Sequence, residues 1–129
     1  MSNRYSDWYA QAQRDLQQAQ ESRIAGHHEW ACFASHQAAE KAAKALHLYS
    51  HQEAWGHNIA RLLSDLPEKS AASRELIDKG RVLDSFYIPP RYPDSFPDGA
   101  PFEHFSTIQS EEALRYAGEI IRFVGTHLA

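Results

Sequence analysis

Cysteine is nearly absent from the sequence, with Cys32 alone among 129 residues. This excludes an intrachain disulfide and any metal site made from several cysteines of one chain. No run of 18 apolar residues occurs, so we expect no membrane-spanning helix. The residues after Met1 are polar and lead into a glutamine-rich segment, unlike the apolar core of a signal peptide. We therefore expect a soluble, cytoplasmic protein.

The sequence also has no large excess of positive or negative charge, and β-branched residues are scarce. The 13 basic and 17 acidic residues leave a net charge of −4, which disfavours nucleic-acid binding through overall charge. Val, Ile and Thr together number only 11, whereas alanine alone occurs 19 times, so the composition favours helices over strands. Only 25 residues are Leu, Ile, Val or Phe, but 15 aromatic residues and the alanines can fill an interior. The length suits a single all-α domain over residues 1–129.

Apolar periodicity, capping residues and helix breakers divide the chain into five expected helices. Their expected first residues are Ser6 or Asp7, Glu29, Asn58, Ser73, and Thr107 or Ser110. The second is expected to end at Tyr49, the third at Leu66 and the fourth at Tyr87. Five of the six prolines lie within residues 88–105, together with several aromatic residues. Prolines exclude regular structure there, but the aromatic content predicts an ordered loop packed on the bundle before the last helix.

The expected helix over residues 29–49 is the most informative segment. One half of its helical wheel holds Cys32 and mostly alanines, without a charge. The other half is polar and carries His36, Gln37, Glu40, Lys41, Lys44 and His47. A wide face of small side chains lets neighbouring helices approach closely on more than one side. We therefore expect this helix at the centre of a bundle, with Cys32 buried rather than acting as a nucleophile.

Eight histidines raise the question of a metal site. Cys32 and His36 lie four residues apart, as do His47 and His51, a spacing that would place two ligands on one helical face. However, the sequence has no His-Glu-x-x-His motif and no Glu followed three residues later by His. We therefore expect neither a metal nor a cofactor.

The charged stripe of the central helix has two interpretations. One is a solvated salt bridge between Glu40 and Lys44, which lie four residues apart in the favourable order. The other is a groove in which Lys41 and Lys44, beside His36 and His47, receive a phosphate. Position alone favours the salt bridge.

An arginine lies among aromatic residues in the proline-rich loop. The segment reads Tyr87-Ile88-Pro89-Pro90-Arg91-Tyr92-Pro93-Asp94. The planar donor fork of Arg91 suits a carboxylate or a phosphate, and a tyrosine ring can stack on a base. The alternative is a structural role, in which Arg91 and Asp94 fasten the loop to the bundle. The two roles are compatible.

Four segments of the chain, in order, resemble the HEPN domain family. Residues 34–46 read Ala-Ser-His-Gln-Ala-Ala-Glu-Lys-Ala-Ala-Lys-Ala-Leu, which is similar to the QAAEKAxKAL helix of that family. The other three segments are Gly56-His57 before a leucine-rich helix, Leu83-Asp84-x-x-Tyr87, and Arg91-Tyr92-Pro93-Asp94. The resemblance extends from Trp8 to the last helix. It implies an antiparallel bundle of four to five helices that commonly forms homodimers.

The resemblance also implies a function. Many prokaryotic members are stand-alone proteins encoded beside a minimal nucleotidyltransferase, and they are thought to bind nucleotide or to serve as its substrate-binding subunit. For this chain the resemblance implies such a partner role in a toxin–antitoxin-like module, without catalysis of its own. The implied ligand-binding residues are Lys41, Lys44 and Arg91 for phosphate, His57 and Asp94 for positioning the loop and its ligand, and Tyr87 or Tyr92 for stacking.

Other members of the family are metal-independent ribonuclease toxins. They use an arginine, a spacer of four to six residues and a histidine at a dimer interface. Two pairs here fit that spacing, Arg23 with His28 and Arg122 with His127. The first pair falls at the end of the first helix, and the second falls late, with Phe123 where the active form often has a polar residue. We infer that the ribonuclease site is absent. RNA cleavage by Arg122 and His127 is the alternative interpretation, and a structural dimerisation module is a third.

Overall fold

The chain folds into five α-helices connected by loops and short 3₁₀ turns. The computed structural model describes residues 3–128, and no strand occurs among them. The α-helices are α1 (Tyr5–Ile24), α2 (His28–Tyr49), α3 (Ile59–Ser64), α4 (Arg74–Asp84) and α5 (Thr107–His127). The 3₁₀ turns are η1 (Glu68–Ser70), η2 (Pro93–Ser95) and η3 (Pro101–His104). The all-α helical bundle expected from the sequence is confirmed, and the two turns η2 and η3 give the proline-rich loop its ordered form.

Side-chain caps determine where the two short helices begin. The Asn58 side-chain oxygen accepts a hydrogen bond from the Arg61 N–H at 2.9 Å, and Ser73 Oγ accepts one from the Leu76 N–H at 3.1 Å. Each bond satisfies a backbone donor that the first turn of a helix leaves free. Both caps lie at the first residues predicted for these helices.

Other helix ends differ from the prediction by one to three residues. α1 begins at Tyr5, before the expected Ser6 or Asp7, because the Asn3 side-chain oxygen accepts the Tyr5 N–H at 3.1 Å. α4 ends at Asp84 rather than at Tyr87. After Asp84 the hydrogen bonds change to the i→i−3 pattern, from the Ser85 N–H to the Val82 carbonyl at 3.2 Å and from the Phe86 N–H to the Leu83 carbonyl at 2.9 Å, so this last turn is no longer α-helical.

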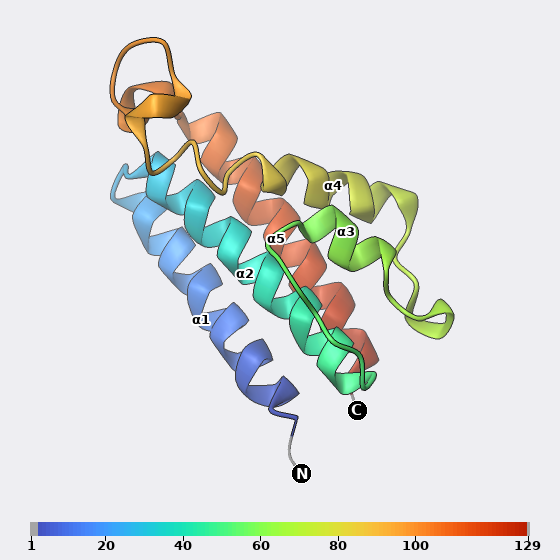
Figure 1. Ribbon diagram of the computed structural model, residues 1–129. Coiled ribbons are helices and arrows are strands. Elements are labelled where there is room, and N and C mark those ends of the chain that lie inside the picture. The colour runs from blue at the N-terminus through green and yellow to red at the C-terminus, as the bar shows by residue number, and fades with distance from the viewer. Residues whose placement is uncertain (1–2, 129) are drawn as a thin grey trace.

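Three long helices lie side by side, and the two short ones cover one side of them (Figure 1). α1 runs antiparallel to both α2 and α5, while α2 and α5 run in the same direction. This arrangement arises because the chain returns through the connection over residues 50–58, α3 and α4 before α5 begins. The proline-rich loop lies at the end of the bundle where α1 turns into α2.

α2 is the central helix, as its alanine pattern predicts, and it contacts the other four helices. Its small-residue face is fully buried at Ala31, Cys32, Ala38, Ala39, Ala42, Ala43 and Ala45. Part of the opposite half is also covered, contrary to the interpretation of that half as a solvated polar surface. His36 and His47 are 0% and 3% exposed, and Glu40 is 4% exposed. The reason is tertiary: α3, α4 and the 50–58 connection pack onto the half of α2 that looks polar in sequence.

Gly80 sets how closely α4 approaches α3. A methyl group at this position would meet Ile59 Cγ2 at 2.9 Å and Leu63 Cδ1 at 3.2 Å, and Gly80 is itself buried. Ile59 Cγ2 is attached directly to a branched Cβ on a buried residue, so it has little freedom to move. The absence of a side chain at residue 80 is therefore a packing requirement.

Gly80→Ala is expected to destabilise the protein by about 1–2 kcal/mol, because overpacking outweighs the higher helix propensity of alanine. Gly118→Ala in α5 is the matched control, since nothing lies within 4 Å of the added methyl group. The control should gain up to about 1 kcal/mol from helix propensity alone. Urea unfolding followed by circular dichroism measures both, and equal shifts for the two variants would contradict the packing argument.

Candidate functional site

Arg91 lies in a cradle of aromatic rings. Its guanidinium carbon is 4.4 Å from the ring centroid of Phe33, 4.6 Å from that of Tyr87 and 5.1 Å from that of Tyr92. Arg91 Nε also donates a hydrogen bond to the Tyr87 carbonyl at 2.8 Å. No carboxylate within residues 3–128 forms an ion pair with this arginine. The cradle therefore holds a positioned cation whose charge is not neutralised by the described part of the chain.

Lys44 is neutralised by a carboxylate within α2. Lys44 Nζ is 2.9 Å from Glu40 Oε2, and the two side chains are 13% and 5% exposed. The sequence predicts this pair as a solvated salt bridge, but it is largely buried because the bundle covers this half of α2. Its ammonium group also lies 5.7 Å from the ring centroid of Trp8. Lys44 is therefore part of a shielded ion pair rather than a free phosphate ligand.

The same carboxylate connects the ion pair to the aromatic cradle. His57 Nδ1 donates to Glu40 Oε1 at 2.9 Å, and the His57 ring stacks on Tyr87 with centroids 4.4 Å apart and planes 19° apart. Tyr87 in turn lies under Arg91. Glu40, His57, Tyr87 and Arg91 thus form one continuous line of contacts from α2 to the proline-rich loop.

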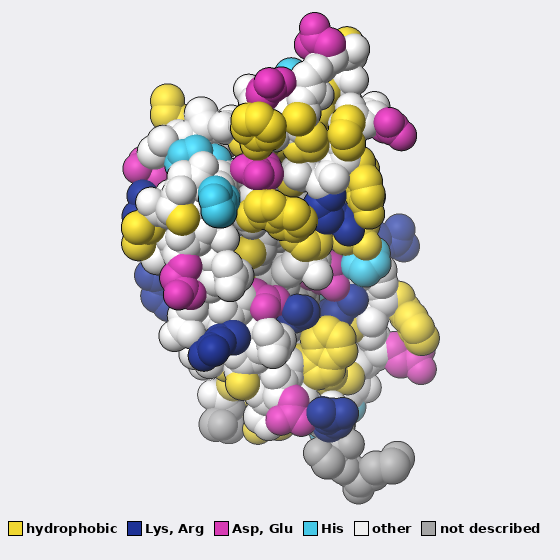
Figure 2. Space-filling model, turned by 90° about the vertical axis from the view of Figure 1, so that its left-hand side faces the viewer, with side chains coloured by type: hydrophobic (Ala, Val, Ile, Leu, Met, Phe, Trp, Pro, Cys, Tyr) yellow, Lys and Arg dark blue, Asp and Glu magenta, His cyan; other side chains and the backbone are white. Residues whose placement is uncertain are grey.

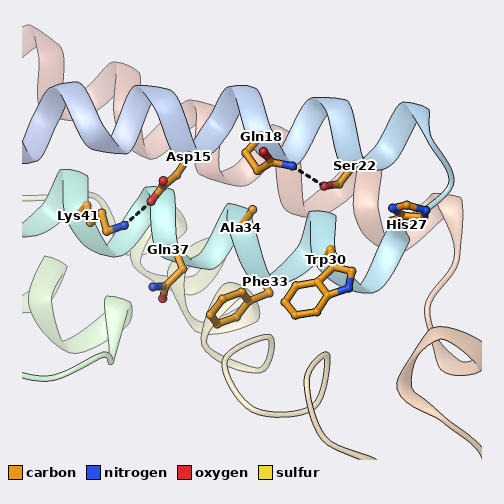
Figure 3. A pocket seen from close by; sticks show the side chains of 9 residues that line it. All are labelled: Asp15, Gln18, Ser22, His27, Trp30, Phe33, Ala34, Gln37 and Lys41. Atoms are coloured by element: carbon orange, nitrogen blue, oxygen red, sulfur yellow. Dashed lines mark hydrogen bonds and ion pairs between the residues drawn. The ribbon is translucent and has the colours of Figure 1, made fainter.

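Lys41 faces α1, where Asp15 neutralises it. Lys41 Nζ is 2.6 Å from Asp15 Oδ2. The pair closes one end of a pocket of about 480 Å³ between α1 and α2, with His27 at the other end (Figure 3). The rings of Trp30 and Phe33 lie side by side along α2 in this view. Phe33 therefore belongs both to this pocket and to the Arg91 cradle.

His36 fixes the backbone of the 50–58 connection beneath the cradle. Its Nε2 donates to the His57 carbonyl at 3.0 Å, and its ring lies 5.0 Å from that of Tyr87. Burial lowers the pKa of His36, while hydrogen bonds and the nearby Glu40 and Asp84 carboxylates oppose that shift. The neutral ring is therefore the form that the folded protein favours.

The pKa shift of His36 predicts a pH dependence of stability. A histidine whose pKa is lowered by folding stabilises the folded state above its unfolded pKa of about 6.5, and this contribution is lost as the pH falls through the folded pKa. The unfolding free energy of the wild type should therefore fall between pH 7 and pH 5 more steeply than that of His36→Gln. Urea unfolding across this range measures the difference. His51→Asn, at an exposed histidine, is the control and should show the same decrease in unfolding free energy with falling pH as the wild type. If His36→Gln also shows the wild-type decrease, this pH dependence does not come from His36.

Asp84 holds α3 in place from the end of α4. Its two carboxylate oxygens accept the N–H groups of Ile59 at 2.6 Å and Ala60 at 3.1 Å. Burial raises the pKa of Asp84, and these two hydrogen bonds act in the opposite direction. Asp84, which belongs to the Leu83-Asp84-x-x-Tyr87 segment, thus caps the start of α3. That helix begins directly after His57 and Asn58.

Most of the predicted ligand-binding residues fall on one part of the molecule. His57, Tyr87, Arg91 and Tyr92 are linked by the ring contacts above, and Lys44 joins them through Glu40. Lys41 lies nearby on α2 but faces Asp15. Figure 2, which faces the side of the molecule where α1 lies, shows basic, acidic and hydrophobic side chains interspersed rather than a continuous basic patch. This distribution agrees with lysines that are paired with acids.

Asp94 forms no hydrogen bond or ion pair with the residues of this cluster in the part of the chain that the structure describes. It is exposed in η2. The expected fastening of the loop by both residues is therefore replaced by the bond from Arg91 to the Tyr87 carbonyl. Phe33 is a member of the cradle that the sequence does not predict, since nothing in its local sequence shows that a residue 58 positions later packs on it.

Arg122 and His127, the alternative ribonuclease pair, lie at the C-terminal end of α5. Arg122 is exposed, and the half-buried His127 ring packs 4.9 Å from that of Phe123. Five residues along a helix correspond to a rotation of about 140°, so the two side chains leave α5 in different directions. A joint site would need groups from elsewhere, such as a second copy of the chain.

Cys32 is buried, as predicted. Burial raises its pKa to about 12, with a smaller contribution from Glu29. The thiol therefore stays protonated and is not a nucleophile at neutral pH. Among residues 3–128, no group of three or more histidine, cysteine or acidic side chains is arranged to hold a metal ion. None of the helices in this part of the chain is long and apolar enough to cross a membrane.

Comparison with known proteins identifies the family. The HEPN domain family matches residues 5–127. TT1696 from Thermus thermophilus, a protein with a crystal structure, is 47% identical in sequence to this chain. The two structures superpose with a TM-score of 0.95 over 98% of this chain and 100% of that one. ST0689, an archaeal HEPN homologue, is 36% identical, with a TM-score of 0.81 over 98% of both chains. An HEPN domain protein from Thermotoga maritima is 34% identical, with a TM-score of 0.75 over 94% of this chain and 96% of that one. A search of curated proteins gives no match. The sequence, the bundle and these similarities together show that the chain belongs to the HEPN family.

Proposed function

We propose that this chain is a non-catalytic HEPN subunit that binds a nucleotide or another phosphate-bearing ligand and acts together with a nucleotidyltransferase. The observation that carries the proposal is Arg91. It is held by three aromatic rings and a backbone carbonyl, and it has no acidic partner within the described residues. A preorganised guanidinium loses little side-chain freedom on binding, and its planar donor fork matches the oxygens of a phosphate.

The surroundings of Arg91 support a ligand that also carries an aromatic base. Tyr92 is 47% exposed and Trp30 is 49% exposed, and Phe33 packs between Trp30 and the guanidinium. Exposed rings next to a cation offer a stacking surface for a base whose phosphate contacts the arginine. In this proposal Arg91 binds phosphate, Tyr92 offers its ring, and Tyr87 and His57 position the arginine and the loop.

The lysines have a different role from the one that the resemblance implies. Lys41 and Lys44 are paired with Asp15 and Glu40, so neither offers an uncompensated charge. In this proposal the two lysines stay paired and do not contact the phosphate. Asp94, exposed on the same loop, is available to a ligand hydroxyl group.

Calorimetric titration with ATP, GTP and their monophosphates, without added metal, tests the ligand. We expect micromolar binding by the wild type and a loss of at least tenfold in affinity for Arg91→Ala. Arg74→Ala, which removes an exposed arginine on α4, is the matched control and should bind like the wild type. Equal affinities for wild type and Arg91→Ala would refute the site, and no binding of any of the four nucleotides would refute nucleotide binding.

The partner is tested separately. Tagged protein from the native host should co-purify with a nucleotidyltransferase. The purified chain should leave RNA intact without metal. RNA cleavage that His127→Ala abolishes would overturn the non-catalytic assignment. Light scattering tests the homodimer that is expected of the family.

A further inference from the structure

The pocket between α1 and α2 adjoins the Arg91 cradle, but the phosphate contact proposed above does not use it. The pocket measures about 480 Å³ and is lined by residues of these two helices and of the turn between them (Figure 3). Phe33 is the lining residue that also contacts Arg91, with its ring centroid 4.4 Å from the guanidinium carbon. A ligand bound to Arg91 can therefore extend over Phe33 into the pocket.

Ala34 leaves the space that forms the floor of this pocket. Trp30, Ala34 and Lys41 are spaced by four and seven residues, so they lie along one side of α2. Figure 3 shows the Ala34 methyl group between the larger side chains of this row. Ala34 is half-buried, so a larger side chain at this position would fill the pocket rather than point away from it.

The charged groups that line the pocket neutralise each other. Lys41 Nζ and Asp15 Oδ2 are 2.6 Å apart, and their side chains are 24% and 16% exposed. Apart from His27 at the opposite end, they are the titratable side chains among the lining residues. A paired lysine attracts a second phosphate less than a free lysine would, and the paired aspartate likewise attracts a metal ion less. The pocket therefore suits an uncharged group.

Aromatic rings and amides supply the other walls. Trp30 is 49% exposed, and its ring centroid lies 6.2 Å from that of Phe33. One end of the Gln18 amide and one end of the Gln37 amide are hydrogen-bonded to neighbouring side chains, each at 3.1 Å. The other end of each amide has no partner among residues 3–128 and remains for a ligand. A ring surface beside free amide groups matches a heterocyclic base, which stacks through its face and hydrogen-bonds through its edge.

We propose that this pocket receives the base of the nucleotide whose phosphate contacts Arg91, an inference that rests on the proposed function and extends it. The base stacks on Trp30, its polar edge reaches Gln37, and its connection to the phosphate passes over Phe33. Tyr92 supports the guanidinium from the loop, with its ring centroid 5.1 Å from the guanidinium carbon. Base recognition is thereby assigned to α2 and phosphate recognition to the proline-rich loop.

Calorimetry with ATP, GTP and inorganic triphosphate separates the two halves of the site. We expect the better-bound nucleotide to have at least tenfold higher affinity than triphosphate. Trp30→Ala, which removes the ring, and Ala34→Leu, which fills the floor, should each lower the nucleotide affinity at least tenfold and leave the triphosphate affinity unchanged. Arg91→Ala should weaken the binding of both ligands. Trp55→Ala removes an exposed tryptophan outside the pocket and is the matched control, which should bind like the wild type.

Fluorescence gives a second readout that needs no substitution in the pocket. Trp8→Phe combined with Trp55→Phe leaves Trp30 as the only tryptophan of the chain. A base stacked on the indole ring quenches its emission, whereas triphosphate has no ring to stack. We therefore expect saturable quenching by the nucleotide and none by triphosphate.

The outcomes distinguish a failure of the base pocket from a failure of the phosphate site. Nucleotide affinity that Trp30→Ala and Ala34→Leu leave unchanged, or a Trp30 emission that the nucleotide does not quench, would overturn the base pocket even if Arg91→Ala weakens binding. A loss in Tyr92→Ala but not in Trp30→Ala would also overturn it and place the base on the loop. A loss in the pocket variants but not in Arg91→Ala would support the pocket and refute the role of the arginine. Absence of nucleotide binding would overturn both.

Discussion

Lys44→Met is expected to lower the free energy of unfolding by about 3 kcal/mol. The reason is Glu40, whose side chain is 5% exposed and whose Oε2 loses the ammonium group at 2.9 Å. Removing one member of a buried ion pair leaves a buried charge without compensation, which is costlier than the pair itself is stabilising. Among residues 3–128, the bond from His57 Nδ1 to Glu40 Oε1 is then the one that this carboxylate keeps. Since domains of this size are stable by about 5–15 kcal/mol, the loss is a large fraction of the total.

Urea unfolding of further variants separates this effect from simple loss of a lysine. Arg74→Met breaks an exposed pair in which Arg74 is 87% exposed, and should change stability by less than about 0.5 kcal/mol. Glu40→Gln combined with Lys44→Met should recover most of the loss, because no charge is then left buried. If Lys44→Met is as mild as Arg74→Met, Glu40 reaches water and the pair is not shielded.

Asp84→Ala is expected to destabilise the protein by about 2–4 kcal/mol. Both Asp84 oxygens accept backbone N–H groups at the start of α3, from Ile59 and Ala60. Hydrogen bonds to a charged group contribute about 1.5–3 kcal/mol each, and the effects of two such bonds to one side chain are not fully additive. α3 has only six residues, so it has few internal hydrogen bonds with which to compensate.

Asp84→Asn keeps one acceptor oxygen, so it should lower the free energy of unfolding by less than Asp84→Ala does. Asp78→Ala, on the same helix at an exposed carboxylate, is the matched control and should be nearly neutral. Hydrogen exchange gives a local readout, since the amides of Ile59 and Ala60 should lose protection before those of α2. Unchanged protection of these two amides in Asp84→Ala would show that the cap is dispensable.

Local patterns in the sequence account for most of the fold. Alanines at helical spacing predict the buried face of α2, and Asn58 and Ser73 predict the starts of α3 and α4. Each of these features acts over a few residues, through periodicity or a cap. The proline-rich loop is predicted for the same reason, since a proline is unfavourable inside an α-helix and is tolerated in a first turn, where Pro93 and Pro101 begin η2 and η3.

Pairings between distant segments limit what the sequence predicts about the site. The Asp15 that neutralises Lys41 comes from another helix, and no local pattern selects it among the acidic residues of the chain. The burial of His36 and Glu40 follows from α3, α4 and the 50–58 connection, not from the polar side of the helical wheel. The aromatic neighbours of Arg91 in sequence single it out, but nothing comparable points to Phe33. A ligand-binding residue is thus easier to predict from the sequence than the distant residue that neutralises it or packs on it.

The parallel course of α2 and α5 has a consequence for the order of folding. α1 and α2 are joined by a turn of only a few residues, so their interface forms from segments that are close in sequence and closes quickly. α5 reaches α2 only after the chain over residues 50–106 has been brought back along the bundle, and closing a loop of this length costs chain entropy before its contacts are made. We therefore expect the α1–α2 hairpin to form first and the docking of α5 to be the slow step. The rate of this docking step then depends on how long the segment over residues 50–106 is and on how much of it is already folded.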